Sequence, residues 1–95
     1  VAALERFDSL GDVSVINLGT GTGTTVRELV TAFNEVVSRP VALVETAPRP
    51  GDVAGAYTRS ERARELLGWQ PDYTVTEGIR HSLDWATIRD TRLAL

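Results

Sequence analysis

Apolar and polar positions alternate with a helical period along four stretches of this chain. The clearest stretch begins at Val26, presents one apolar face and ends before Pro40, which a helix interior excludes. The first stretch ends at Gly11 and the third at Gly68, and glycine suits the left-handed position that closes a helix. We therefore predict helices over residues 2–10, 26–39, 61–67 and 75–89. Asn34 is expected on the solvent-exposed face of the second helix. The expected buried face of the last helix consists of Val75, Ile79, Leu83 and Ala86.

Two capping boxes mark the starts of two of these helices. Thr25 is followed three residues later by Glu28, and Thr74 is followed by Glu77 at the same spacing. In a capping box the hydroxyl accepts a hydrogen bond from the third helical N–H, and the acid reaches back to the N–H of the cap residue. Ser60 is expected to cap the short helix predicted over residues 61–67.

Two short apolar runs flank the helix that begins at Val26. Val13–Ile16 precedes it and Val41–Val44 follows it, and both are rich in β-branched residues, which indicates strands. A strand–helix–strand order implies parallel pairing with a right-handed crossover. The sequence therefore predicts an α/β fold in which short parallel strands are packed by helices.

Composition excludes several classes of function. At 95 residues and a net charge of −3, the chain is one domain at most and does not attract nucleic acid or an anionic membrane. It has no cysteine and a single histidine, which excludes disulfides and thiolate metal sites and suits a cytoplasmic location. No apolar run is long enough to span a bilayer.

Because the helical pattern starts at Val1 without a cap, we expect that the chain is a piece of a larger protein.

A glycine-rich loop, Gly19–Gly23, lies between the first predicted strand and the helix that follows. This order, with Glu45 at the end of the next predicted strand, is typical of a dinucleotide site. The spacing is Gly-x-Gly-x-Gly, however, and Thr24 stands where the third glycine of the dinucleotide pattern belongs. Three interpretations stay open: a dinucleotide site, a tight strand-to-helix turn, or a helix start that faces another polar ligand.

The most informative polar segment is Arg49-Pro50-Gly51-Asp52. Proline stiffens the backbone and glycine bends it, so the segment holds one cation and one carboxylate in a fixed turn. A guanidinium can bind phosphate through two parallel hydrogen bonds, and a carboxylate can accept from a sugar hydroxyl. The alternative is a surface ion pair of little energetic value.

By contrast, His81 and Asp84 share a helix face without any catalytic partner, which favours a solvent-exposed polar face.

The motifs, taken in order, resemble the C-terminal part of the UDP-glucose 4-epimerases. These are extended short-chain dehydrogenase/reductase enzymes that act on nucleotide sugars. The resemblance covers nearly the whole chain, and the Pro-Arg-Pro-Gly-Asp-Val run is its most specific part. The matching segments are Ile16–Gly21, Thr25–Val26, Ala47–Val53, Tyr57 and Leu66–Pro71.

The resemblance implies a role for three residues. Arg49 would bind the nucleotide diphosphate, Asp52 would accept from the UDP ribose, and Val26 would contact the nucleotide at the start of its helix. The sequence departs from the family pattern after Tyr57, where Thr58 stands in place of a small residue and is not followed by an aspartate. The chain has no lysine, so it cannot hold the Tyr-x-x-x-Lys pair on which catalysis in this family depends.

The resemblance also implies the activity of the parent protein, an isomerase of galactose metabolism. Bound NAD would take hydride from C4 of a UDP-hexose while a tyrosine removes the hydroxyl proton, and the keto sugar would turn and take the hydride back. NAD and the catalytic groups would lie in an N-terminal Rossmann domain outside this chain, which alone would be inert. The full-length enzyme would be a homodimer. The alternatives are a 4,6-dehydratase, a UDP-glucuronate decarboxylase, or a stand-alone α/β binding module.

Overall fold

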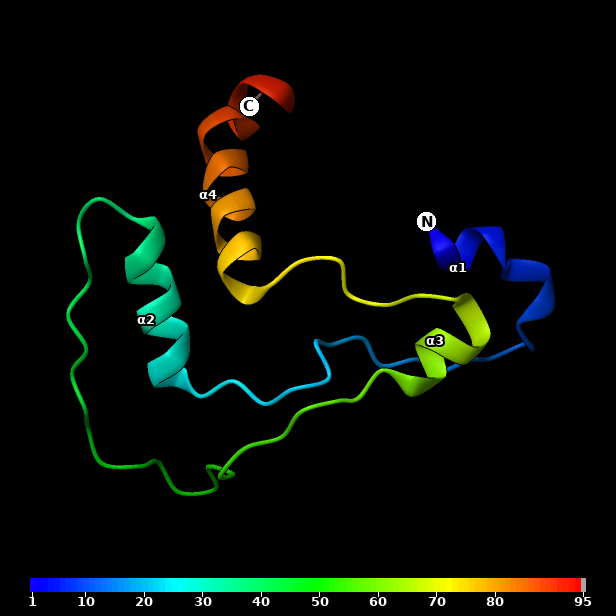
Figure 1. Ribbon diagram of the computed structural model, residues 1–95, viewed down its shortest axis with the longest axis horizontal. Coiled ribbons are helices and arrows are strands. Elements are labelled where there is room, and N and C mark those ends of the chain that lie inside the picture. Colours follow the sequence, from blue (N-terminus) through cyan, green and yellow to red (C-terminus); the bar gives the residue numbers. More distant parts are fainter. Residues whose placement is uncertain (95) are drawn as a thin grey trace. The chain divides into compact units, whose positions relative to one another are not determined.

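The computed structural model describes residues 1–94, and within them every regular element is a helix (Figure 1). The chain divides into two compact units, one made of Val1–Gly23 with Val53–Asp72 and the other of Thr24–Asp52 with Tyr73–Leu95. The elements are α1 (Ala2–Glu5), the 3-10 helix η1 (Phe7–Ser9), α2 (Val26–Val36), α3 (Glu61–Leu67) and α4 (Val75–Arg92).

The prediction of an α/β fold with parallel strands is wrong. Neither Val13–Ile16 nor Val41–Val44 is a strand in the structure. Residues 11–18 form no backbone–backbone hydrogen bond with any described residue, and the backbone of Val41 bonds to a side chain instead of a neighbouring strand. Preference for β structure reflects packing against a paired strand, and neither run has such a partner among residues 1–94. Both runs are therefore exposed, irregular segments.

Both capping boxes are confirmed. The Glu28 N–H donates to Thr25 Oγ1 at 3.2 Å, and the Thr25 N–H and hydroxyl both donate to Glu28 Oε2 at 2.7 Å. Thr74 and Glu77 repeat this arrangement at the start of α4. Hydrogen bonds from the threonines stabilise the charged carboxylates and so lower the pKa of both Glu28 and Glu77. The main cause is the Thr25 hydroxyl at Glu28 and the Thr74 N–H at Glu77.

Helices α2 and α4 belong to the same unit and lie side by side (Figure 1). The predicted apolar face of α2 is half-buried at Val30 and Phe33, but Val26 at its start is 73% exposed. On α4, which extends beyond its predicted end, Leu83 is half-buried, whereas Ala86 is exposed and not buried as predicted. The two helices thus share a partial apolar contact and not a closed core.

The first helix ends earlier than the sequence predicts. Helix α1 ends at Glu5, and Arg6 has a φ of −109° and a ψ of 11°, outside the regular helical range. The Ser9 hydroxyl then donates to the Arg6 carbonyl at 2.7 Å, which stabilises the 3-10 turn in place of a continuous helix. Gly11 does not adopt a positive φ, so its predicted role as a left-handed cap is wrong.

At α3, one predicted boundary residue acts as expected and the other does not. Gly68 has a φ of 64°, and its N–H donates to the Arg64 carbonyl at 2.9 Å, so it closes the helix as predicted. Ser60 occupies the cap position but makes no side-chain cap bond. Its hydroxyl donates instead to the Gly19 carbonyl at 2.9 Å, and its φ of 57° is in the left-handed region. A partner distant in sequence therefore replaces the local cap.

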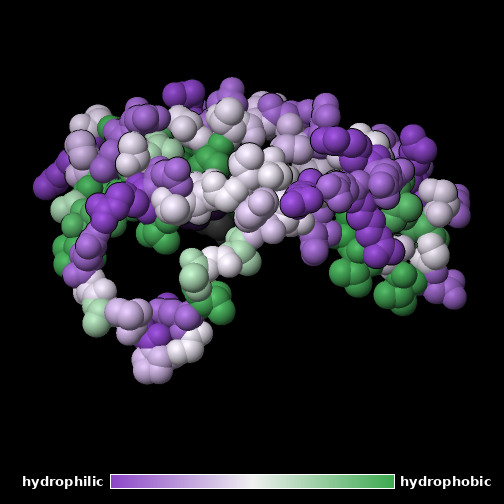
Figure 2. All heavy atoms as spheres, turned by 60° about the horizontal axis from the view of Figure 1, so that its bottom comes forward, coloured by the Kyte–Doolittle hydropathy of each residue, from purple (hydrophilic) through white to green (hydrophobic). Residues whose placement is uncertain are grey.

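Little apolar surface is buried within residues 1–94. Ala63 is fully buried and Ser60 is 8% exposed, while large apolar side chains lie at the surface, where they form visible green patches (Figure 2). None of the described helices has the length and apolarity that crossing a membrane requires. The exposed apolar residues include Val1, Leu4, Phe7, Val13, Val44 and Val53.

Candidate functional site

The Arg49–Asp52 segment is a tight turn whose form follows from its residues. The Asp52 N–H donates to the Arg49 carbonyl at 3.1 Å, which closes a four-residue turn. Pro50 supplies the fixed φ of the second position, and Gly51 has a φ of 87° at the third, as a type II turn requires. The turn therefore holds Arg49 and Asp52 at neighbouring ends of one rigid loop.

The Asp52 side chain folds back onto the first residue of this turn. Its Oδ2 accepts from the Arg49 N–H at 2.9 Å, and its Oδ1 lies 3.5 Å from Arg49 Nη2. The Arg49 side chain is 87% exposed and that of Asp52 is 43% exposed, so the ion pair itself contributes little to stability. The structure thus brings together two of the three predicted site residues.

This arrangement suits the binding of an anion. The guanidinium has five donors, and the long contact to Asp52 Oδ1 involves only one of its nitrogens. The remaining donors of this exposed group face solvent, where a phosphate could accept from them in pairs. The backbone of Arg49 is meanwhile fixed by hydrogen bonds at both its carbonyl and its N–H.

The third predicted site residue, Val26, is the first residue of α2 and is exposed. A cavity of about 470 Å³ lies beside the start of this helix, but its lining includes none of Val26, Arg49 and Asp52. It is lined by Thr25, Arg27, Glu28, Thr31, Ala32, Glu35 and Thr76. The structure therefore leaves Val26 accessible without joining it to the turn in one cavity.

The residues that suggested a dinucleotide site form contacts with other residues of the chain. The N-terminus of α2, where a pyrophosphate would bind, already holds the Glu28 carboxylate. Glu45, the expected ribose acceptor, forms an ion pair with Arg27 of α2. The Glu28 carboxylate therefore lies where a pyrophosphate would accept from the N–H groups of the helix start.

Close packing within its own unit explains Gly19, and a positive φ explains Gly21. A Cβ atom on Gly19 would lie 2.5 Å from Thr58 Cγ2, closer than real Cβ atoms approach other groups. A Cβ on Gly23 would lie 3.5 Å from the Tyr57 ring, and Gly21 has a φ of 82°. The backbone bends at residues 21–22, and the contact at Gly19 with the positive φ of Gly21 favours a structural role for the loop.

Asn34 is a structural residue that the sequence analysis placed wrongly, on the solvent-exposed face of its helix. Its Nδ2 donates to the Val41 carbonyl at 3.1 Å, and its Oδ1 accepts from the Val41 N–H at 2.8 Å. The amide thereby satisfies both backbone groups of Val41 and attaches the following segment to α2. A polar residue near the end of an amphipathic helix is the only sequence signal that could have suggested this role.

The polar face of α4 holds no group of residues that indicates catalysis or metal binding. His81 and Asp84 are both exposed on α4, as predicted, and His81 packs edge-on against Tyr73 with ring centres 4.8 Å apart. Among residues 1–94, no group of three or more His, Asp or Glu side chains could hold a metal ion.

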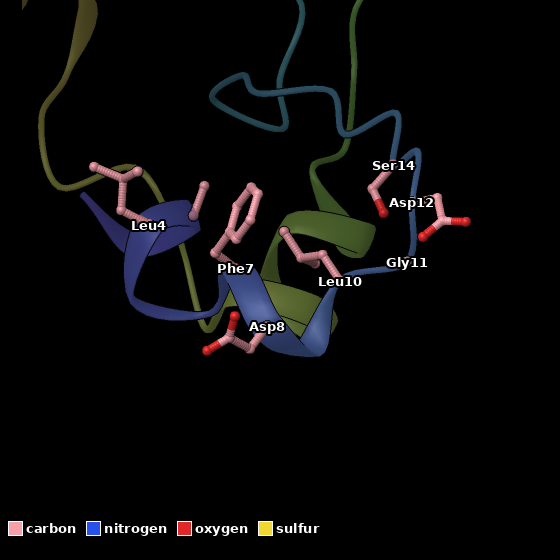
Figure 3. Close-up of a pocket in the computed structure, with 8 residues that line it drawn as sticks. Leu4, Phe7, Asp8, Leu10, Gly11, Asp12 and Ser14 are labelled. Carbon is pink, nitrogen blue, oxygen red and sulfur yellow. The ribbon is translucent and has the colours of Figure 1, made fainter.

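A cavity of about 600 Å³ lies along α1 and η1, and its lining includes none of the predicted site residues. Leu4, Phe7 and Leu10 project on one side of these helical turns, and Asp8 projects on the other (Figure 3). The hollow is thus mainly apolar and contains no titratable cluster that would indicate catalysis.

Comparison with known proteins identifies relatives over almost the whole chain. A UDP-glucose 4-epimerase of Rhizobium leguminosarum bv. trifolii is 44% identical over 85 residues, which is 90% of this chain and 26% of the relative. The UDP-glucose 4-epimerase of Bifidobacterium longum is 36% identical, and UDP-glucose 4-epimerase 2 of Arabidopsis thaliana is 38% identical, each over 92% of this chain and 25% of the relative. No family model and no solved structure matches the chain.

These relatives confirm the resemblance that the sequence motifs indicated. The chain is related to epimerases that act on a nucleotide sugar. More specifically, it corresponds to a part of the UDP-glucose 4-epimerases, and it spans about a quarter of the length of the relatives it matches.

Proposed function

We propose that this chain is the nucleotide-anchoring part of a UDP-glucose 4-epimerase. Arg49 binds the diphosphate of the UDP-sugar, Asp52 accepts a hydrogen bond from its ribose, and Val26 contacts the nucleotide. The observation that carries this proposal is the type II turn, which fixes the backbone of Arg49 and leaves its guanidinium exposed. Similarity to UDP-glucose 4-epimerases over nine-tenths of the chain supports the choice of ligand.

Epimerisation explains why such an anchor is needed. Inversion at one ring carbon requires that the carbon be approached from both faces, so the sugar must reorient while the nucleotide stays in place. A charge-assisted hydrogen bond to phosphate contributes about 1.5–3 kcal/mol. A guanidinium on a rigid turn supplies this binding without first losing backbone freedom.

The reacting groups lie outside this chain in our proposal. NAD, when bound, would supply the acceptor and donor of hydride, and we place its site in a separate Rossmann domain. The chain also has no lysine for the Tyr-x-x-x-Lys pair of this family, and we propose that it is inert alone. Its partners are then the UDP-sugar and that Rossmann domain, in a homodimeric enzyme.

The alternative functions have less support. A stand-alone binding module would bury its apolar residues, whereas Leu4, Phe7 and Val13 lie at the surface of this chain. A 4,6-dehydratase or a decarboxylase of nucleotide sugars has no counterpart among the three relatives described above, each of which is a UDP-glucose 4-epimerase.

Calorimetric titration of the full-length enzyme with UDP tests the proposal. We expect Arg49→Ala to weaken UDP binding about tenfold or more, because a charge-assisted contact is lost. The matched control is Arg39→Ala, which removes another exposed arginine of the same unit. Equal effects from the two variants would show that Arg49 does not anchor the ligand. Asn34 is unsuitable as a control because its amide holds Val41.

A further inference from the structure

We propose that Asp52 is also a positioning residue, which holds Arg49 ready for the diphosphate. This inference rests on the proposed function of Arg49 as the diphosphate anchor. The two oxygens of Asp52 have different partners: Oδ2 accepts from the Arg49 N–H, and Oδ1 faces the Arg49 guanidinium. Asp52 can therefore act on Arg49 through the backbone and the side chain separately.

The backbone contact closes the turn from both directions. The Asp52 N–H donates to the Arg49 carbonyl, and the Arg49 N–H donates back to Asp52 Oδ2. These two bonds fix the peptide groups on either side of the Arg49 Cα. The direction in which the arginine side chain leaves the backbone is thereby set before any ligand binds, which reduces the freedom lost on binding.

The side-chain contact is loose enough to be exchanged. Arg49 Nη2 and Asp52 Oδ1 are 3.5 Å apart, whereas a charge-assisted N–H···O bond is about 2.7–2.9 Å long. A phosphate oxygen can replace Oδ1 as the partner of the guanidinium without breaking a tight bond. Oδ1 is then available to a ribose hydroxyl, while Oδ2 stays on the Arg49 N–H.

This role differs measurably from that of a residue that only contacts the ribose. If Asp52 only accepted from the ribose, its substitution would not weaken binding of a ligand without ribose hydroxyls. The loss of UDP binding would also be the same with and without Arg49. A positioning residue would keep its effect with such a ligand and lose it when Arg49 is absent. The two roles are therefore separated by changing the ligand and the arginine independently.

The experiment is calorimetric titration of the full-length enzyme with UDP and with 2′,3′-dideoxyuridine diphosphate, which has no ribose hydroxyl. We expect Asp52→Ala to weaken binding of the dideoxy ligand about three- to tenfold. In an enzyme that already carries Arg49→Ala, adding Asp52→Ala should change the affinity for this ligand by less than about twofold. Asp52→Asn, which retains an oxygen for the Arg49 N–H, should restore most of the loss. Asp84→Ala, an exposed aspartate of α4, is the matched control.

Gly51→Ala provides a second variant that keeps both charged residues. Its φ of 87° is unfavourable for alanine, so the turn should open and binding of the dideoxy ligand should weaken as it does in Asp52→Ala. If Asp52→Ala leaves dideoxy binding unchanged, the positioning role is wrong, whatever its effect on UDP. If Arg49→Ala leaves UDP binding unchanged, the proposed anchoring function itself is wrong, which is a distinct result.

Discussion

The glycine loop at Gly19–Gly23 and the turn at Arg49–Asp52 use the same residue type for opposite purposes. In the loop, Gly19 lets the backbone pass close to Thr58, and the Gly19 carbonyl accepts the Ser60 hydroxyl. In the turn, Gly51 supplies a positive φ and has open space around it. Glycine at position 19 thus serves close packing, whereas glycine at position 51 serves the backbone conformation of the turn.

Replacement of Gly19 by alanine should produce the largest change in stability. The new Cβ would meet Thr58 Cγ2 at 2.5 Å, and we expect a loss of about 1–3 kcal/mol in the free energy of unfolding. Adding Thr58→Ser, which removes the clashing methyl group, should recover part of the loss. Thermal and urea unfolding of the full-length enzyme would measure both variants.

The control for this prediction is Gly11→Ala, because nothing lies within 4 Å of a Cβ placed there. If Gly19→Ala and Gly11→Ala were equally stable, the loop would not be closely packed against Thr58. The contrast between a packed loop and an open turn would then fail.

Replacement of Pro50 by alanine should have a smaller effect. Proline at the second position of a type II turn restricts the unfolded chain, so we expect a loss of about 0.4–1 kcal/mol. UDP binding by the full-length enzyme should change less than about twofold, because both hydrogen bonds between Arg49 and Asp52 remain. A larger loss of binding would mean that proline, and not Asp52, fixes the turn.

Features that depend on residues close in sequence were predictable. Thr25 with Glu28 predicted a capping box, and the Pro50-Gly51 pair predicted a rigid bend, because each feature is closed by contacts three residues apart. Arg49 and Asp52 were brought together for the same reason. The roles of these residues toward UDP stay predictions.

Features that depend on distant partners were not predictable. Val13–Ile16 has the composition of a strand, but a strand exists only when another segment pairs with it. Ser60 bonds to Gly19, 41 residues away, so its local sequence indicated a cap that it does not form. Asn34 was assigned to solvent because helical periodicity does not show that an amide can bind the backbone of Val41.

The smallest predicted effect concerns the start of α2, directly after the glycine loop in sequence. Hydrogen bonds from Thr25 lower the pKa of Glu28, so the folded chain binds a proton at this carboxylate less readily than the unfolded chain does. This contribution to stability is present above the unfolded pKa of about 4.3 and is lost as the pH falls through the lower folded value. Far-ultraviolet circular dichroism should therefore show a loss of helix on acidification that is smaller in Glu28→Gln.

Glu35→Gln, which replaces an exposed acid on the same helix, is the control. An unchanged acid response in Glu28→Gln would mean that the carboxylate does not hold the helix start.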